Sequence, residues 1–303
     1  MGGAEHRTPL TVKELAPETA TSFIRAYHYS KVLPRLNKHY LGLYRDGVLC
    51  GVVTLGWGTQ PLQTIRKLFP KHQLKTTDYL EIGKMCFLPS ENGNGYFGSL
   101  ALSALIKWVR QETGCLFLYT LADGVMGKCG YVYQAANFRY LGHFLTSVYR
   151  DAATGEKIHP RSAGLLLKEN ADLDGVHRRH WLTHEFCMIK GIEKIDGRMF
   201  RYIYPLSGEA KKILRQYPQY QSLPYPKDRD LFFRVRTGDR QYIAIPPPRF
   251  DRDVCRYNPQ KFDRLEVMTH ERPLEAPRQG NTENEPRRAD CGKRNQRNHR
   301  AYQ

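Results

Sequence analysis

The sequence predicts a mixed α/β protein: a mostly antiparallel central sheet flanked by helices, a C-terminal β-rich extension and a disordered basic tail. Three observations predict this class. Residues 80–142 have the pattern strand, glycine turn, helix, strand; residues 40–55 hold two apolar runs around Asp46-Gly47; and residues after about 270 lack core-forming side chains. Asp-Gly between alternating runs is a strong hairpin signal, and a segment without apolar residues does not order itself.

The central stretch begins with a mostly buried strand at residues 79–88, which Pro89 ends. Apolar residues at helical spacing then predict a helix over 99–112, and a second buried strand follows at 115–121. Asp123 comes just after that strand. Ligands of open α/β sheets bind at the carboxyl ends of strands, so this is the expected active region.

A glycine-rich turn joins the first of these strands to the helix. Gly93, Gly95 and Gly98 allow close backbone approach to a ligand. Together with Ser99 at the helix start, they are the expected binding site for the phosphate or carboxylate of a donor. The three glycines also match a dinucleotide fingerprint, with Asp123 as its acidic residue, although the spacing is longer than usual. The alternative is the pyrophosphate-binding turn of an acyltransferase.

The start of the chain adds a helix and a hairpin. Residues 10–26 predict an amphipathic helix, and His28-Tyr29-Ser30 follows it directly. The basic, polar stretch up to residue 39 suits a loop that faces a substrate. The hairpin of residues 40–55 comes next.

Beyond Gly142 the pattern predicts a strand at 144–149 and then a hairpin that pairs 181–189 with 199–206 across Asp196-Gly197. A further hairpin, over 231–245, follows a proline- and tyrosine-rich strap. The expected domains are therefore a catalytic domain at 1–226, a hairpin extension at 227–269 and a disordered basic tail at 270–303.

Composition limits the class of partner. The net charge is +17, and the tail from residue 270 holds 8 Lys/Arg against 5 Asp/Glu, so residues 1–269 keep 39 against 25. A basic folded body attracts DNA or RNA by counterion release. No apolar run approaches the ~20 residues of a membrane span. The N-terminus lacks the apolar core of a signal peptide, and seven cysteines without a C-x-x-C pair argue against a disulfide framework. A cytoplasmic protein that binds nucleic acid is expected.

Two segments carry a resemblance to a known family. Residues 127–142, Gly-Lys-Cys-Gly-Tyr-Val-Tyr-Gln-Ala-Ala-Asn-Phe-Arg-Tyr-Leu-Gly, are similar to the short helix and following strand late in GNAT acyltransferase domains. Together with His28-Tyr29-Ser30, they resemble the Mom family of phage DNA adenine-modification proteins over roughly residues 20–225. The resemblance implies a GNAT-like fold and a transferase that converts adenine in double-stranded DNA to N6-carbamoylmethyladenine, which protects phage DNA from host restriction.

The resemblance also implies roles for individual residues. The catalytic candidates are His28, Tyr29, Ser30, Asp123 and Tyr133. His28, Tyr29, Asp123 and Tyr133 form the implied metal set, and its nitrogen and oxygen ligands suit iron. Tyr133 is the preferred aromatic to stack on a flipped base.

The identity of the donor stays open. The usual Arg/Gln-x-x-Gly-x-Gly/Ala turn for coenzyme A is absent from the sequence. The product joins N6 through a CH2 group, so the donor is either an acyl-coenzyme A whose carbon undergoes redox chemistry or a glycine-like molecule. The alternatives to DNA modification are an acyl-coenzyme A-dependent N-acyltransferase that acts on a small amine or tRNA, and a DNA-binding protein without enzymatic activity.

Overall fold

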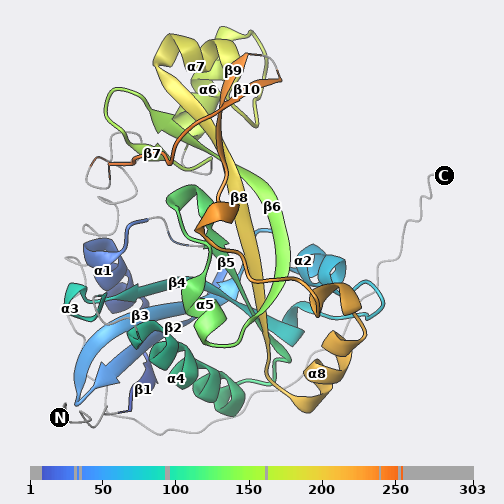
Figure 1. The fold of residues 1–303 in the computed structure, drawn as a ribbon. Coiled ribbons are helices and arrows are strands. Elements are labelled where there is room, and N and C mark those ends of the chain that lie inside the picture. The colour runs from blue at the N-terminus through green and yellow to red at the C-terminus, as the bar shows by residue number, and fades with distance from the viewer. Residues whose placement is uncertain are drawn as a thin grey trace, which may run out of the picture. The chain divides into compact units, whose positions relative to one another are not determined.

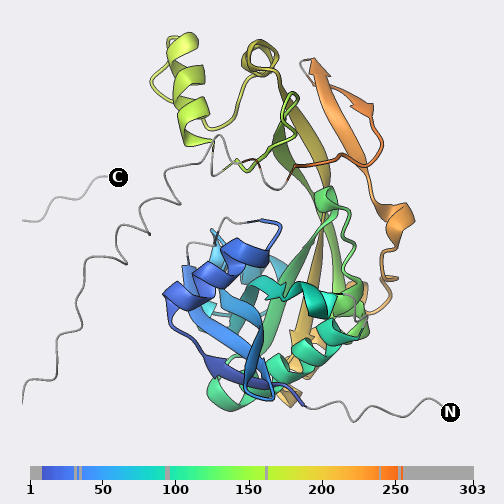
Figure 2. The same ribbon diagram turned by 90° about the vertical axis from the view of Figure 1, so that its left-hand side faces the viewer.

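The computed structural model describes residues 9–254 except 31–32, 34–35, 93–95, 161–162, 239 and 252–253. The chain divides into two compact units, Met1–Pro259 and Gln260–Gln303. The second unit, and with it the tail expected at 270–303, lies outside the described residues. The first unit holds all the elements below (Figures 1 and 2).

A mixed sheet forms the centre of the molecule, as the sequence predicts. Its strands lie in the order β1-β2-β3-β4-β5-β8-β6-β7, with β9 paired to β8 and β10 paired to β9. β4 and β5 run parallel, and the other neighbouring strands of the described part run antiparallel. The strands are β1 Thr11–Glu14, β2 Leu36–Arg45, β3 Val48–Trp57, β4 Tyr79–Phe87, β5 Phe117–Asp123, β6 Arg139–Asp151, β7 Lys157–Ile158, β8 Ile192–Pro205, β9 Phe233–Gly238 and β10 Gln241–Ala244.

Helices cover both faces of the sheet. Neighbouring residues of a strand point to opposite faces, and Leu118 packs in one apolar cluster with α4 whereas Phe117 packs in another with α2 and α8. Likewise Val53 belongs to the α4 cluster and Val52 to the cluster of α1. One face therefore carries α1, α2 and α8, and the other carries α4 and α5. The helices are α1 Pro17–Tyr27, α2 Pro61–Leu68, α3 Pro89–Asn92, α4 Phe97–Glu112, α5 Tyr131–Ala135, α6 Gly164–Leu173, α7 His184–Lys190 and α8 Gly208–Arg215.

Strands β6 and β8 are long, and they extend beyond the rest of the sheet (Figure 1). At their far end lie α6, α7, β7 and the β9–β10 hairpin. We call this part, residues 144–198 with 233–251, the arm. Strand β9 pairs with β8 through Ile195 and Val235, so the hairpin after residue 227 continues the same sheet.

Two predicted elements differ from the structure. Residues 11–14 are not helical but pair with β2, so the first helix begins only at Pro17. The hairpin predicted across Asp196-Gly197 is wrong, because residues 192–205 form one continuous strand. Residues 184–190 are instead a helix, which the Thr183 side chain caps at its start and Gly191 ends in the left-handed conformation. Gly197 is needed inside the strand because a Cβ there would lie 2.8 Å from Val125.

Candidate active site

The parallel pair β4–β5 separates halfway along its length. Residues Tyr79 to Ile82 pair with Phe117 to Thr120, and no pairing follows among the described residues. Beyond that point β4 stays with β3 and β5 stays with β8. The register between β3 and β4 skips Gly83, since Leu55 pairs with Ile82 and Thr54 with Lys84. The carboxyl ends of the two strands therefore move apart, where a ligand can enter the sheet.

Two cavities occupy this gap. One, of about 320 Å³, is lined by His28, by the ends of β4 and β5, and by residues 127–133 of the turn and helix α5. The other, of about 190 Å³, reaches from the same strand ends to Trp57 and Gly58, just before α2. We call them the α5-side and α2-side cavities. The two cavities have six lining residues in common: Tyr29, Ile82, Gly83, Lys84, Leu121 and Asp123. The site is thus reached from both faces of the sheet.

His28 follows the last residue of α1, and the backbone of Ser30 holds its imidazole in place. Its Nδ1 atom lies 2.9 Å from both the amide nitrogen and the carbonyl oxygen of Ser30, and its ring stacks on Tyr29 with centres 4.3 Å apart. Burial, and after it the positive charge of Lys84, lower the pKa of His28 to about 3, with smaller effects from Lys128 and Lys157. The imidazole is therefore uncharged at neutral pH, with Nε2 as its remaining ring nitrogen.

Three lysines, Lys84, Lys128 and Lys157, give the site its charge; we call them the lysine cluster. The Lys84 Nζ atom donates hydrogen bonds of 3.1 Å to the carbonyl oxygen and to the hydroxyl of Ser30. The Nζ of Lys128 lies 3.9 Å from the centre of the Tyr29 ring, a cation–π contact. Lys157 comes from β7, far away in sequence. Lysines in a strand or a turn look like surface residues in a sequence, so sequence reasoning missed all three.

Asp123 ends β5 and has two partners. Its Oδ1 accepts a hydrogen bond from the Val125 amide at 3.1 Å, which caps the short 3₁₀ helix Gly124–Met126. Its Oδ2 lies 2.9 Å from the Nζ of Lys157. The sequence left open whether Asp123 is a cap or a charged group of the site, and the structure shows that it is both. A role as general base remains a prediction.

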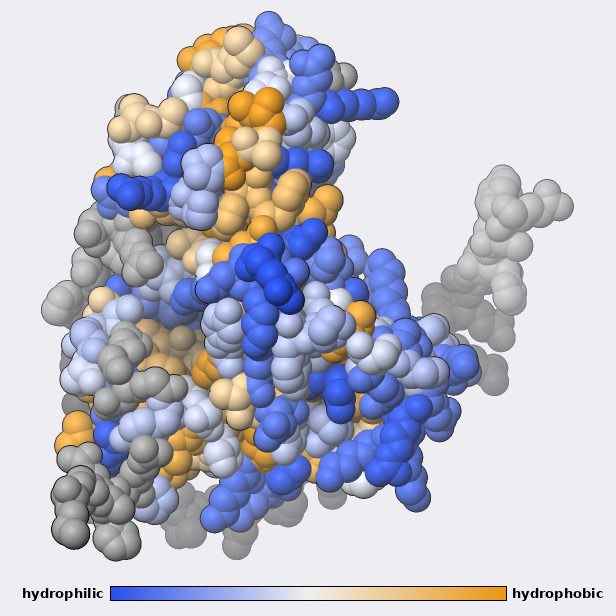
Figure 3. Space-filling model, in the orientation of Figure 1, coloured by the Kyte–Doolittle hydropathy of each residue, from blue (hydrophilic) through white to orange (hydrophobic). Residues whose placement is uncertain are grey.

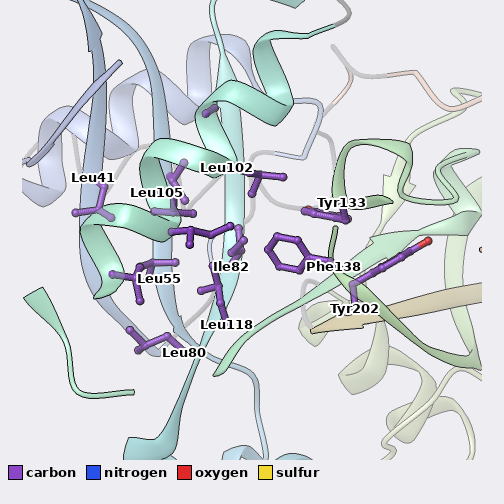
Figure 4. Packing of buried hydrophobic residues seen from close by; sticks show 14 of the residues in the cluster. Leu41, Leu55, Leu80, Ile82, Leu102, Leu105, Leu118, Tyr133, Phe138 and Tyr202 are labelled. Atoms are coloured by element: carbon purple, nitrogen blue, oxygen red, sulfur yellow. The ribbon is translucent and has the colours of Figure 1, made fainter. Parts of the chain in front are cut away.

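Tyr133 reaches the α5-side cavity but belongs mainly to the core. Only 9% of it is exposed, and its ring packs against Phe138 and Tyr202 at centre distances of 5.6 and 5.5 Å (Figure 4). Burial raises the pKa of its phenol, so the phenol stays protonated. Tyr29, with a ring that lies at the junction of the two cavities, is better placed than Tyr133 to contact a base.

A family comparison fits this geometry. A sequence model of the Mom protein family matches residues 9–227. The chain belongs to the Mom family. Methylcarbamoylase Mom of Escherichia phage Mu is 26% identical over 225 residues, which cover 71% of this chain and 85% of that protein. The residues that line both cavities all lie inside the matched range.

Solved structures with a similar fold are GNAT acetyltransferases. The spermidine N-acetyltransferase of Vibrio cholerae has a TM-score of 0.35 and 10% identity, covering 68% of this chain and 98% of that one. An acetyltransferase of Bacillus subtilis has a TM-score of 0.34 and 13% identity, covering 66% and 100%.

The four residues expected to bind a donor do not form one site among the described residues. Gly93 and Gly95 lie outside the described residues. Gly98 is a packing position, because a Cβ there would lie 2.4 Å from Val132 on α5. The Ser99 hydroxyl donates to the carbonyl oxygen of Tyr96 at 2.8 Å and lines a separate groove between α4 and α5. Gly98 and Ser99 therefore line neither the α5-side nor the α2-side cavity, and their contact with a donor remains a prediction.

The charges of the site oppose the implied iron set, although His28, Tyr29, Asp123 and Tyr133 all line the α5-side cavity. Of the four implied ligands, Tyr133 stays protonated and Asp123 is already bonded to Lys157. The lysine cluster would also repel a cation. We therefore derive no chemical step through iron. The site is suited instead to groups that carry or develop negative charge.

No helix of the described residues combines the length and the apolar character needed to cross a membrane.

Proposed function

We propose that this Mom-family chain is a transferase that attaches a carbamoylmethyl group to N6 of adenine in duplex DNA and so protects phage DNA from host restriction. The observation that carries the proposal is the match to the Mom family over residues 9–227, the range that builds the site. The relative from phage Mu is a methylcarbamoylase by name. A base inside a duplex cannot reach a cavity in a sheet, so the target adenine is flipped out of the helix.

The lysine cluster favours a donor route without redox chemistry. In this route a glycyl ester or thioester is the donor. The N6 nitrogen attacks the glycyl carbonyl carbon, the carbon–oxygen or carbon–sulfur bond breaks, and the alcohol or thiol leaves with the N6 proton. N6-glycyladenine forms. Its free amine then attacks C6 through a five-membered ring, and the bond from C6 to the original N6 breaks.

This second step is a rearrangement and needs no other reactant. One proton passes from the incoming amine to the departing nitrogen, which becomes the carboxamide nitrogen of the product. The product is N6-carbamoylmethyladenine, with glycinamide joined through its amine. Atoms and electrons balance without an oxidant, and the first step is ordinary acyl transfer.

The residues of the site have clear tasks in this route. The ammonium groups of Lys84 and Lys128 stabilise the oxyanion that forms at the glycyl carbonyl. The same positive charge, which lowers the pKa of His28, lowers the pKa of the glycyl amine and keeps it an uncharged nucleophile. The Nε2 atom of neutral His28 is available to hydrogen-bond the adenine amine or the donor amine.

The test is nucleoside analysis of DNA from cells that express the chain. A carbamoylmethyl, a methylcarbamoyl and a glycyl group on N6 have the same mass, so the mass alone is insufficient. Hot acid distinguishes them, because the carbamoylmethyl product gives N6-carboxymethyladenine and the other two return adenine. We expect N6-carboxymethyladenine. Unmodified DNA from cells with folded protein contradicts the proposal, and an acylated small amine or tRNA in those cells would favour an acyltransferase.

Isotope labelling tests the donor separately. Cells are fed glycine labelled with ¹³C and ¹⁵N, and the modified nucleoside is fragmented between N6 and CH2. The rearrangement predicts that glycine nitrogen stays bonded to C6 and that the original adenine nitrogen becomes the carboxamide. Direct alkylation would leave the adenine nitrogen on C6, and displacement by glycinamide would remove it as ammonia. Either of the last two results contradicts the rearrangement while leaving the DNA product intact.

A further inference from the structure

Helices α2 and α8 present a row of exposed positive side chains on one side of the molecule. The two helices lie on the same face of the sheet, on the right in Figure 1, and hydrophilic side chains cover that side in Figure 3. Six exposed cations come from these helices and from the third residue after α2: Arg66, Lys67, Lys71, Lys211, Lys212 and Arg215. We call this set the basic face.

These cations are not neutralised by neighbours. None of the six forms an ion pair within the described part of the chain. Glu209 is the one exposed carboxylate on α2 or α8. The arm differs, because Arg150, Arg179, Lys190 and Arg234 each pair with an Asp or Glu. The positive charge of the basic face is thus not offset by ion pairs in the described part of the chain.

The basic face is also rigid. The Tyr217 hydroxyl, just after α8, accepts a hydrogen bond of 3.0 Å from the Lys71 amide and lies 2.9 Å from Nδ1 of His72. The Tyr220 hydroxyl donates to the carbonyl oxygen of Leu68 at 3.0 Å. Phe69 stacks on Phe117 of the sheet with ring centres 4.8 Å apart. The segments that follow α2 and α8 are therefore joined to each other and to the core beneath them.

The same face of the sheet leads to the active site. Helix α2 begins at Pro61, three residues after Gly58, which lines the α2-side cavity. Trp57, another lining residue, donates from Nε1 to the carbonyl oxygens of Thr76 and Tyr79 at 2.9 and 3.0 Å, and the Tyr79 hydroxyl donates to the carbonyl oxygen of Pro61. An eight-residue helix is about 12 Å long. The segment that carries Arg66 and Lys67 is therefore tied through Trp57 and Pro61 to the wall of the α2-side cavity.

We propose that the basic face is the docking surface for duplex DNA. The phosphate backbone lies along α2 and α8, and the flipped adenine enters through the α2-side cavity past Trp57. The inference rests on the proposed function for the identity of the substrate. The occupant is a regular polyanion, because the exposed lysines and arginines of α2 and α8 form no ion pairs among the described residues and complement the charge of phosphates. Contacts to phosphates position the duplex but do not distinguish its base sequence. The donor then reaches the lysine cluster from the α5-side cavity, so the two substrates do not compete.

The experiment compares two variants of the full chain with equal loss of charge. The first is R66Q/K67Q/K211Q/K212Q on the basic face. The matched control is K168Q/R178Q/R240Q/R249Q on the arm, where all four side chains are also exposed and form no ion pair among the described residues. Binding to a short labelled duplex is measured by fluorescence anisotropy across a range of salt concentrations, after melting curves have established that both variants fold.

We expect the basic-face variant to bind at least about tenfold more weakly at physiological salt. Each lost phosphate contact lowers the salt slope by about 0.9, so the slope should fall by roughly 3–4. The control should bind like the wild type. Equal weakening in both variants, or none in the first, overturns the docking surface. The docking surface is also overturned if the basic-face variant loses heparin binding and DNA binding equally while its KM for DNA stays at the wild-type value.

The two proposals fail separately. If the wild type binds duplex through the basic face but DNA from expressing cells is unmodified, the proposed function fails and the docking surface stands. If the DNA is modified and both variants bind it normally, the docking surface fails and the function stands.

Discussion

The two halves of the β4–β5 pair have opposite properties. In the first half, Tyr79–Ile82 and Phe117–Thr120 are hydrogen-bonded, and Leu80 and Leu118 are buried in the core below α4. In the second half the strands separate, and Lys84 and Asp123 line a polar cavity in their place. One pair of strands therefore supplies stability at one end and chemistry at the other.

The outer neighbours of the pair make this division possible. Beyond the separation, β4 keeps its hydrogen bonds to β3 and β5 keeps those to β8, so each strand remains fixed while its inner edge faces the cavity. A site on rigid strands holds its side chains more accurately than a site on loops. Substitutions in the separated half should thus change activity, and substitutions in the paired half should change stability.

The largest expected effect is on turnover, in the separated half. Lys84→Gln removes a positive charge from the site while keeping a side chain that can hydrogen-bond Ser30. Loss of one group that stabilises an oxyanion typically costs about 10²–10³ in kcat, and we expect a loss of that order with little change in Tm. Formation of modified deoxyadenosine per mole of folded protein is the measurement. The division of roles is wrong if Lys84→Gln retains full activity.

The paired half should show the reverse. Leu118→Ala leaves a cavity under α4, and a change of this kind costs about 2–5 kcal/mol of unfolding free energy. Urea unfolding measures this cost, and activity per folded molecule should stay near the wild-type value. A stable Leu118→Ala variant without activity would contradict the comparison.

Gly98 tests whether its role is packing or donor binding. Gly98→Ala places a Cβ against Val132, and overpacking of this kind costs about 1–3 kcal/mol. Val132→Ala removes the clashing methyl groups, so the double variant should regain stability relative to Gly98→Ala. A stable, inactive Gly98→Ala variant, with no rescue by Val132→Ala, would restore the donor-binding role.

The effect of His28 depends on pH. Its folded pKa of about 3 lies below the unfolded value of 6.5, so the unfolded state binds more protons between these values. The contribution of His28 is fully present above pH 6.5 and is lost on acidification, by up to about 1.4 kcal/mol per pH unit. Unfolding free energies measured from pH 7 to 4 should fall more steeply for the wild type than for His28→Asn. Equal slopes would show that His28 is not held neutral.

Much of the fold could be predicted because its signals are local. Asp46-Gly47 marked the β2–β3 hairpin, and helical spacing marked α4. The sequence also pointed to residues that the structure brings together, since His28, Tyr29, Ser30 and Asp123 line the two adjoining cavities, and their catalytic roles remain predictions. These residues come from the ends of predicted elements, where a sequence pattern is informative.

The errors concern contacts between distant segments. Lys157 lies 34 positions from its partner Asp123, and no local pattern places it in the site. The sequence suggested only a ligand-binding role for Gly98, which remains a prediction, and did not show its close packing against Val132 on another helix. The helix α7 was missed because its caps, Thr183 and Gly191, were outweighed by an alternating pattern and by Asp196-Gly197, which lies within a strand.

The central claim is that the cavity between the separated strands is where DNA adenine is modified. Asp123→Asn tests it most directly. Asparagine caps a helix about as well as aspartate, so the cap on Val125 and the Tm should be preserved, whereas the ion pair with Lys157 is lost. Nucleosides of DNA from cells that express this variant should contain little or no carbamoylmethyl-deoxyadenosine, beside abundant product from the wild type. Wild-type levels of the modified nucleoside from Asp123→Asn would contradict the account.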